Sequence, residues 1–395
     1  EEGGISPGGI GYDINCGVRL LRSNLKKEDI GDKIKELLDK IFKYCPAGLG
    51  GSNIKVDKEQ INEILEKGAR WAVENDYGNE DDLEHCEESG NLKKADASSV
   101  SEKAKNRGKK QIATLGSGNH FLEVQYVDEI FDKETAKAFG ITEKGQVTFM
   151  IHCGSRGLGH QVCSDYLRKM EKQFPEILKK LPDRELIYAP AGSDMAEEYF
   201  KAMCAAANFA WCNRHVLGHQ TRKAVKEVIG DKAELKTVYD VAHNIAKVEE
   251  HDIGGEKKKV WVHRKGATRA FGPGRKEIPE AYRDVGQPII IPGSMGGGSY
   301  VLVGTNEGMK ETFGSTAHGA GRIMSRHQAK KEFWGETIKK ELEKKNIFVK
   351  AASMSGIAEE APGAYKDPDE VVRVSDKAKI GKLVVRLRPL GVVKG

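Results

Sequence analysis

The sequence lacks long hydrophobic runs. None of its stretches approaches the ~18 consecutive apolar residues that a membrane-spanning helix requires, and hydrophobic residues make up only 38% of the 395 positions. The opening residues are acidic and Gly-rich, whereas a secretory signal begins with basic and then apolar residues. We therefore expect neither a membrane segment nor export from the cell.

The sequence also has few cysteines and only a small excess of positive over negative charge. The seven cysteines are scattered and form no CxxC pair, which disfavours a disulfide scaffold or zinc finger and is typical of a cytoplasmic protein. The 64 Lys and Arg residues nearly balance the 59 Asp and Glu residues, leaving a net charge of +5. That balance allows a local basic groove but does not by itself indicate a nucleic-acid partner.

No repeat or Pro-, Gly- or Ser-rich linker divides the chain, which predicts a single domain over residues 1–395. The hydrophobic pattern indicates a mixed α/β (α+β) body with helices around mixed β-sheets. We expect strands at 18–21, 147–152, 236–243, 259–264, 288–292, 300–304, 347–351 and 383–388, and helices at 30–44, 57–71, 194–229 and 329–345.

Two segments depart from this pattern. Residues 76–110 are polar and charge-rich with few apolar anchors, and we interpret them as a surface excursion. The chain has no initiator Met and opens inside a Gly-rich loop, so we expect an N-terminal part of the domain to be missing.

Glycine is abundant, and its clusters coincide with side chains that bind metals. Asp13 and Cys16 lie three apart in GYDINCG, and His120 lies in GSGNHFLE. His152 and His243 each end a predicted strand, the place where α/β proteins position ligands. A lone histidine of this kind is most often a hydrogen-bonded core residue, but the same arrangement recurs in several loops.

Together these side chains form a mixed nitrogen, oxygen and sulfur set. Such a set suits a borderline divalent ion such as Mn²⁺, Zn²⁺ or Fe²⁺. A shared thiolate could bridge two ions, and a bridged pair suits in-line displacement at phosphorus. The residues alone therefore indicate a two-metal enzyme of phosphoryl transfer.

Two further loops are suited to phosphate. PGSMGGGS follows the apolar run 289–291 and can present backbone N–H groups as an anion nest, although it lacks the Lys of a Walker A loop and could be a flexible turn. In STAHGAGR, His318 has small neighbours that leave room for an adduct, and Arg322 and Arg326 would share a helix face. The alternative for this segment is the start of an ordinary surface helix with a solvated histidine. Lys394, taken alone, would be a solvated lysine in a disordered C-terminal tail.

These motifs resemble the RtcB family of RNA-splicing ligases. The resemblance rests, in chain order, on GGIGYDINCGVR, LGSGNHFLEV, HCGSRGLG, YDVAHN, VHRKGATRA, PGSMGGGSYVLVG and HGAGR, and Lys394 extends it. It implies an RtcB-like fold with two Mn²⁺ ions in a central cleft, bridged by Cys16. One ion would also take Asp13 and His120, and the other His152 and His243.

The resemblance also implies a nucleotide site. His318 would be the nucleophile that takes GMP from GTP. The implied contacts to GTP are Asn119, His120, Phe121, Leu122, Glu123, His243, Asn244, Pro292, Gly293, Ser294, Met295, Ser299, His318, Gly319, Ala320, Gly321 and Lys394.

The implied reaction joins an RNA 2′,3′-cyclic phosphate or 3′-phosphate end to a 5′-hydroxyl end, as in tRNA splicing and RNA repair. The GMP-histidine intermediate would guanylylate the 3′ end before the ends are joined. The implied partners are RNA (tRNA exon halves), GTP and a small activator protein, archease. The arginines that we expect to contact RNA phosphates are Arg156, Arg264, Arg269, Arg322 and Arg326.

Two other functions fit parts of the pattern. A two-metal phosphodiesterase or phosphatase acting on RNA or nucleotides would use the same ligands to activate water, but it has no need of a nucleophilic His318. A structural metalloprotein or RNA-binding module would need no reaction at all. Only 7% of the residues are aromatic, and no RRM-like or OB-like pattern is present, which disfavours a pure binding module.

Overall fold

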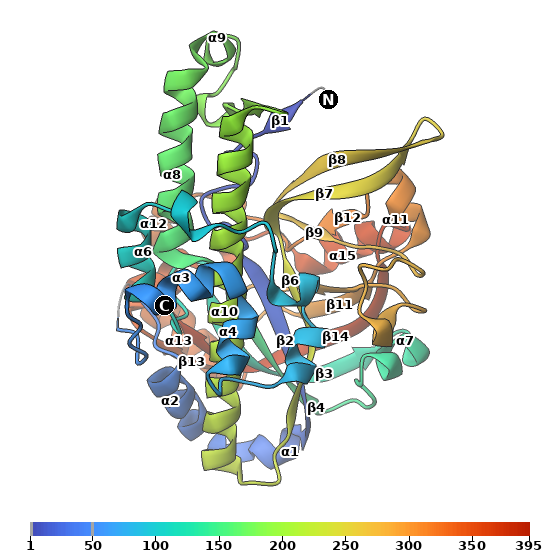
Figure 1. The fold of residues 1–395 in the computed structure, drawn as a ribbon. Coiled ribbons are helices and arrows are strands. Elements are labelled where there is room, and N and C mark those ends of the chain that lie inside the picture. The colour runs from blue at the N-terminus through green and yellow to red at the C-terminus, as the bar shows by residue number, and fades with distance from the viewer. Residues whose placement is uncertain (1–2, 49–50) are drawn as a thin grey trace.

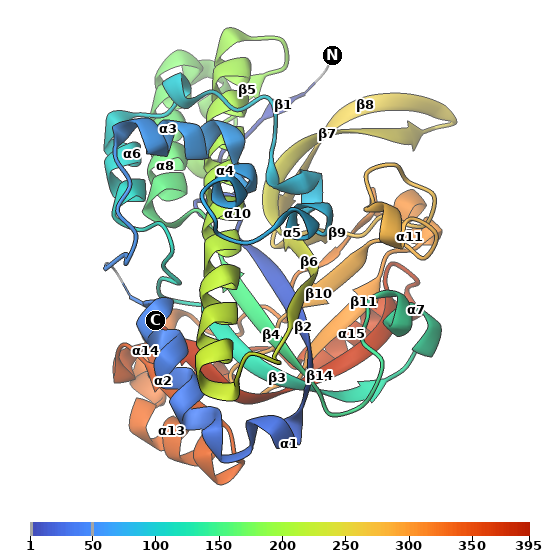
Figure 2. The ribbon, with the colours of Figure 1, turned by 60° about the horizontal axis from the view of Figure 1, so that its bottom comes forward.

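The computed structural model of the chain describes residues 3–48 and 51–395, so Glu1 and Glu2 of the opening segment lie outside the described residues. Helices flank a large, mainly antiparallel sheet (Figure 1, Figure 2), which confirms the predicted mixed α/β class. The strands are β1 (Gly4–Ile5), β2 (Gly17–Lys26), β3 (Phe121–Ile130), β4 (Gln146–Cys153), β5 (Ala189–Pro190), β6 (Leu235–Ala242), β7 (Asn244–Ile253), β8 (Glu256–Lys265), β9 (Ala267–Arg269), β10 (Pro288–Ile291), β11 (Ser299–Val303), β12 (Ser315–Ala317), β13 (Phe348–Ala351) and β14 (Lys382–Lys394).

The helices include one very long element and many short ones. They are α1 (Lys27–Ile30), α2 (Ile34–Tyr44), α3 (Lys58–Lys67), α4 (Ala69–Glu74), α5 (Glu80–Glu84), α6 (Glu102–Lys109), α7 (Lys133–Ala138), α8 (Arg156–Gln173), α9 (Pro175–Leu178), α10 (Asp194–Ile229), α11 (Asn306–Glu311), α12 (Arg326–Glu332), α13 (Gly335–Lys344), α14 (Met354–Glu359) and α15 (Pro368–Lys377). Across the two described ranges, no helix is both long and apolar enough to cross a bilayer.

The central sheet has eight strands, in the order β10-β11-β14-β3-β4-β2-β6, with β13 added beside β14. β13 runs parallel to β14, whereas the other neighbours are antiparallel. Successive side chains of a strand point to opposite faces, and in β2 Leu20 and Leu21 join different hydrophobic cores. Both faces of the sheet are therefore covered.

Helix α10 is 36 residues long and crosses the molecule (Figure 1, Figure 2). Its N-cap is Ser193, whose hydroxyl accepts the backbone N–H of Ala196, so Asp194 and Glu197 occupy the first turn rather than the cap. Fully buried alanines at 205–207 let α3, α4 and α8 pack closely around it. The predicted boundaries of this helix are confirmed.

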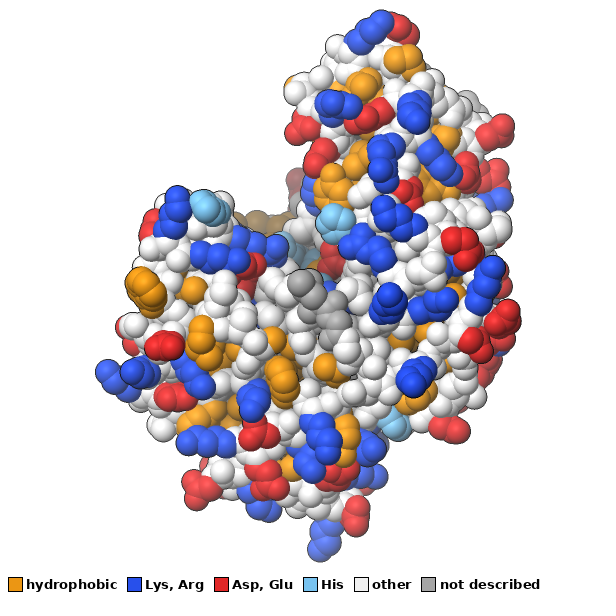
Figure 3. Space-filling view, turned by 90° about the vertical axis from the view of Figure 1, so that its left-hand side faces the viewer, with side chains coloured by type: hydrophobic (Ala, Val, Ile, Leu, Met, Phe, Trp, Pro, Cys, Tyr) orange, Lys and Arg blue, Asp and Glu red, His pale blue; other side chains and the backbone are white. Residues whose placement is uncertain are grey.

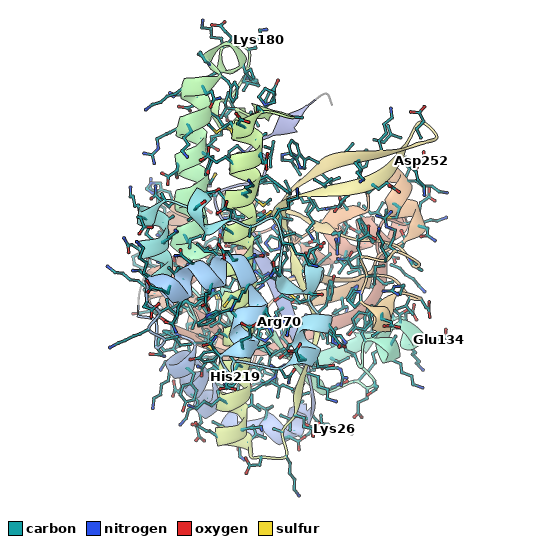
Figure 4. All side chains as sticks on the ribbon, in the orientation of Figure 1. Lys26, Arg70, Glu134, Lys180, His219 and Asp252 are labelled. Carbon is teal, nitrogen blue, oxygen red and sulfur yellow. The ribbon has the colours of Figure 1, made fainter. Side chains whose placement is uncertain are left out.

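Strands β7 and β8 form a separate two-stranded ribbon that projects from the body (Figure 1). Figure 4 places Asp252 at the outer end of this ribbon and Lys180 at the far tip of the α8–α9 lobe.

Residues 76–110 are only in part a surface excursion, and here the prediction is wrong. The segment contains α5 and α6 and contributes to the core around α10 through Leu83, Cys86, Ala97, Val100 and Ala104. It also buries Asp82 against Arg222 and Glu87 against Lys247. Acidic residues whose basic partners lie far along the chain resemble solvated charge in the sequence, which explains the error.

The single helix predicted over 329–345 is also wrong, because α12 and α13 are separate. The backbone of Phe333 is extended (φ −116°, ψ 142°), and its side chain packs against the core on one face of the sheet. Anchoring this ring outweighs the helix propensity of the surrounding Lys and Glu residues. The last strand, by contrast, is longer than predicted and reaches Lys394.

Candidate active site

Four adjacent strands, β3, β4, β2 and β6, present their predicted ligands at one edge of the sheet. Because neighbouring strands are antiparallel, β2 and β3 begin at the edge where β4 and β6 end. This edge carries Asp13 and Cys16 before β2, His120 before β3, His152 within β4 and His243 after β6. The structure thus brings together ligands that are far apart in the sequence.

The cluster is compact. The Sγ of Cys16 lies 3.4 Å from Nε2 of His120 and 3.4 Å from Nε2 of His152. The Nε2 atoms of His152 and His243 are 3.3 Å apart, and Nε2 of His120 is 2.8 Å from Oδ2 of Asp13. The ligand atoms form two groups that share Cys16, one with His152 and His243 and the other with Asp13 and His120.

The electrostatics of the cluster fit a divalent cation. Burial, followed by the charge of Asp13, raises the pKa of Cys16 well above its usual value. Burial also lowers the pKa of His152 and of His243 well below the ordinary value. Neutral imidazoles and a thiol that face one another at these distances form a donor set without a positive charge of its own, which is the arrangement that a metal ion completes.

His318 lies directly after β12, which pairs with β9 and so brings Gly266 beside the imidazole. Its Nδ1 is 2.8 Å from the carbonyl oxygen of Gly266. The Nδ1–H therefore donates to that carbonyl, and the lone pair of Nε2 stays free. Burial lowers the pKa of His318, and its ring centroid lies 4.7 Å from that of His243. The arrangement provides a neutral nucleophile beside the cluster.

A cavity of about 280 Å³ opens at His318 and reaches His152 of the cluster. Seen from the side on which Figure 1 labels α12 and α6, the molecule has a notch with basic side chains on its walls and histidine at its base (Figure 3). The predicted residues that line the cavity are Asn119, Phe121, Glu123, Pro292, Gly293, Ser294, Met295, His318, Gly319, Ala320, Gly321 and Lys394.

Three residues predicted to contact GTP are placed elsewhere. Leu122 points to the opposite face of the sheet and is buried in the core. The side chain of Asn244 accepts the N–H of Gly266 and donates to the carbonyl of Asp13. The hydroxyl of Ser299 accepts the N–H of Gly293 at 3.0 Å. Asn244 and Ser299 therefore hold loops of the site, whereas His120 and His243 belong to the cluster.

The sequence analysis missed Glu360, Tyr365 and Val392, which also line the cavity. Nη1 of Arg322 donates to the hydroxyl of Tyr365 at 3.0 Å and pairs with Glu360 at 3.2 Å. The available signal was the acidic pair before Ala-Pro-Gly in EEAPGAY. Without a neighbouring metal or phosphate motif, that pair resembles an ordinary surface turn.

Lys394 is docked rather than frayed, as the family resemblance implied. It ends β14 between β3 and β13 and is 2% exposed. Its Nζ lies 3.8 Å from Oε2 of Glu360 and 5.6 Å from the ring centroid of Phe121. Burial lowers the pKa of Lys394 to about 8 and raises that of Glu123 to about 8. The cavity therefore contains a cation and a carboxyl that both lack the stabilisation of bulk water.

Two of the predicted RNA-binding arginines, Arg322 and Arg326, line the cavity. They do not share a helix face as predicted, because α12 begins only at Arg326. Both nevertheless converge on Glu360, at 3.2 Å for Arg322 and 3.5 Å for Arg326. The side chain of Arg326 is 53% exposed, which leaves it accessible to a large ligand.

The other three arginines have structural partners. Arg264 and Arg269 are each 1% exposed and pair with buried or half-buried glutamates, so the prediction that they contact RNA is wrong. Arg156 donates to the carbonyl of Gly48 at 3.0 Å and to the hydroxyl of Thr114 at 3.2 Å. It fastens loops beside the site rather than lining the cavity.

Comparisons with known proteins point to one family over the full length of this chain. Residues 1–395 match the family model described as tRNA-splicing ligase RtcB. The chain is 57% identical over 399 residues to the tRNA-splicing ligase RtcB of Archaeoglobus fulgidus, covering 100% of this chain and 83% of that protein. Identity to the proteins of that name from Thermococcus kodakarensis and Pyrobaculum aerophilum is 56% and 55%, with the same coverage. The chain therefore belongs to the RtcB family.

Proposed function

We propose that the protein is an RNA ligase that uses GTP and two Mn²⁺ ions to join RNA 2′,3′-cyclic phosphate or 3′-phosphate ends to 5′-hydroxyl ends. One observation carries the proposal: the free Nε2 of His318 faces a cavity that the Cys16-centred cluster also reaches. A hydrolase needs only the cluster. A nucleophile beside it is expected of an enzyme that stores a nucleotide covalently.

The first step would form the covalent intermediate. Nε2 of His318 attacks the α-phosphorus of GTP, the bond from this phosphorus to the bridging oxygen breaks, and pyrophosphate leaves. Nδ1 keeps its proton throughout, and this N–H stays hydrogen-bonded to the carbonyl oxygen of Gly266. The product is a phosphoramidate between His318 and GMP. Backbone N–H groups in the part of the Gly-rich loop that lines the cavity, residues 292–295, could hold the phosphates.

The later steps would transfer the nucleotide and join the ends. Water opens a cyclic phosphate to a 3′-phosphate, an oxygen of that phosphate displaces His318 from GMP, and the 5′-hydroxyl then attacks the activated 3′-phosphorus and releases GMP. Mn²⁺ would be held by Asp13, Cys16, His120, His152 and His243, and when bound it supplies charge neutralisation at the phosphate oxygens. Arg322 and Arg326 at the cavity mouth would contact RNA phosphates.

Family membership supports three further parts of the proposal. The substrates are tRNA exon halves, archease acts as an activator, and the enzyme works in the cytoplasm, which agrees with seven unpaired, buried cysteines.

The test is labelling with α-³²P-GTP and MnCl₂. The protein should retain a label that is stable to alkali and lost in acid. His318→Ala should retain none, whereas His327→Ala, a matched change at an exposed histidine, should label normally. An unlabelled wild-type protein that removes RNA phosphates in the same buffer would instead be a two-metal phosphodiesterase or phosphatase.

A further inference from the structure

A buried guanidinium group lies beneath the metal cluster. Arg214, in the middle of α10, is 0% exposed. Its Nη1 donates to the backbone carbonyls of Asn15 and Cys153, both at 2.8 Å, and its Nη2 donates to Oδ1 of Asn15 at 2.9 Å. Asn15 directly precedes Cys16, and Cys153 directly follows His152. One side chain thus binds the backbone beside two proposed ligands.

The same guanidinium reaches the strand of a third ligand. Nε of Arg214 donates to Oδ1 of Asp240 at 2.9 Å, and Nε of Arg19 donates to Oδ2 of Asp240 at 2.8 Å. Asp240 is 0% exposed and lies in β6, three residues before His243. The carboxylate therefore fixes the orientation of Arg214 relative to the end of β6.

Local packing leaves little freedom for this arrangement. Asn15 has a left-handed backbone (φ 51°), and its Nδ2 donates to the carbonyl of Ala207 on α10 at 2.7 Å. A Cβ at Gly17 would lie 2.4 Å from the carbonyl oxygen of Val241 in β6 and 3.0 Å from Cζ of Arg214. The glycine after Cys16 thus lets this loop approach both the backbone of β6 and the guanidinium.

We propose that Arg214 is a positioning residue that sets the relative placement of Cys16, His152 and His243, an inference that rests on the proposed metal centre. A buried ion pair alone is weak evidence of any role, because its desolvation offsets its attraction. The distinguishing feature is the planar fork, which bonds two backbone segments and one carboxylate at once. A lysine keeps the charge but cannot reproduce that geometry.

The experiment is a titration of the metal-free full chain with Co²⁺, followed by the visible ligand-field bands and the near-ultraviolet thiolate band. Arg214→Lys should remain folded by circular dichroism and bind Co²⁺ about 10- to 100-fold more weakly, the range typical for loss of a residue that orients metal ligands. The thiolate band should weaken in parallel. This readout does not depend on ligation activity.

Arg222→Lys is the matched control. Arg222 lies on the same helix and pairs with buried Asp82 at 2.5 Å, and its backbone acceptor is Leu235, away from the cluster. It should lose thermal stability yet keep wild-type Co²⁺ affinity. Equal weakening in both lysine variants, or wild-type affinity and bands in Arg214→Lys, would overturn the inference.

If Arg214→Lys does not fold, the Asn15→Gly variant tests the positioning role of Arg214 instead. Glycine tolerates the left-handed backbone at this position but removes the Oδ1 that Nη2 contacts. Weaker Co²⁺ binding in this variant supports the inference, and unchanged binding contradicts it. A wild-type protein that binds no Co²⁺ would remove the proposed metal centre itself, an outcome that the variants cannot mimic.

Discussion

The hydrogen bond from Nδ1 of His318 to Gly266 decides what this imidazole can do. With the proton held at Nδ1, the other nitrogen is an acceptor and a nucleophile at neutral pH. Gly266 itself has φ 65°, and a Cβ there would lie 3.2 Å from Cε1 of His318. Any side chain at this position would push the ring away from its present place.

We predict that Gly266→Ala slows guanylylation by about 10-fold, because a Cβ 3.2 Å from Cε1 moves the ring of His318 by less than the ~1 Å that costs about 100-fold. The rate of ³²P labelling of the protein measures the rate of guanylylation. Gly255→Ala is the control, since Gly255 also has positive φ (86°) but nothing lies within 4 Å of its added Cβ. Similar labelling rates in the two variants would contradict the prediction.

For Arg322→Ala we predict a much larger loss in RNA joining than in guanylylation. Arg322 lines the cavity, and the proposal assigns it to the RNA rather than to GTP. Gel assays of RNA joining and of protein labelling, run on the same preparation, give the two rates. Equal losses in both assays would mean that Arg322 acts on the nucleotide pocket through Glu360 and Tyr365.

All five proposed metal ligands could be predicted from the sequence, because four lie in short Gly-rich strings of unusual composition and His243 ends a predicted strand. Arg214 could not be predicted, because an arginine inside a helix pattern indicates a solvated face. Its role depends on Asp240, Asn15 and Cys153, which reach it only through the tertiary fold. Glu360 was missed for the same reason, since its partner Arg322 is distant in the sequence.

Among the secondary-structure elements, the long helix and most strands of the central sheet were predictable because their hydrophobic period is strong, whereas β3, β7 and α8 were not predicted and the helix predicted over 57–71 is divided into α3 and α4. The interruption of the helix predicted over 329–345 and the packing of residues 76–110 could not be predicted. Phe333 interrupts a helix-forming run because its ring is anchored in the core. Residues 76–110 are held by ion pairs that no local pattern reveals. Two such pairs join Glu88 to Lys247 at 2.9 Å and to Arg269 at 2.7 Å.

This ion-pair network predicts a pH dependence of stability. The charge of Lys247, followed by that of Arg269 against the opposing effect of burial, lowers the pKa of Glu88 from 4.5 to about 2. A carboxyl with a lowered folded-state pKa stabilises the protein above its unfolded pKa, and this stabilisation is lost as the pH falls through the folded value.

We therefore predict that Glu88→Gln lowers the free energy of unfolding at pH 7 by about 1–3 kcal/mol. The gap between wild type and variant should narrow as the pH falls from 4.5 toward 2. Urea unfolding at several pH values measures it. Glu84→Gln, a change at an exposed residue of α5, should leave the pH profile unchanged, and a constant gap for Glu88→Gln would contradict the prediction.

Across the entire protein, the Cys16-centred cluster connects the loop before β2 to β3, β4 and β6. A bound ion would act as a cross-link between these strands in the folded state alone. We predict that MnCl₂ raises the melting temperature and that EDTA reverses the rise, because a ligand at about 100 times its Kd adds about 2.7 kcal/mol of stability.

Differential scanning fluorimetry checks this prediction. Cys16→Ser removes the atom shared by both ligand groups and should abolish most of the Mn²⁺-dependent rise. His85→Ala, at a half-buried histidine outside both groups, should keep it. A rise of equal size in Cys16→Ser would show that Mn²⁺ stabilises the protein from another site.

The spread of the proposed ligands from residue 13 to residue 243 has a consequence for biosynthesis. Translation delivers Asp13 and Cys16 first, but the imidazole at 243 leaves the ribosome only after β6. A nascent chain therefore holds no complete set of the proposed ligands for most of its synthesis, and under the proposed function metal would be loaded late. The proposed transfer of GMP to the protein would come later still, because His318 follows all five proposed ligands in the sequence.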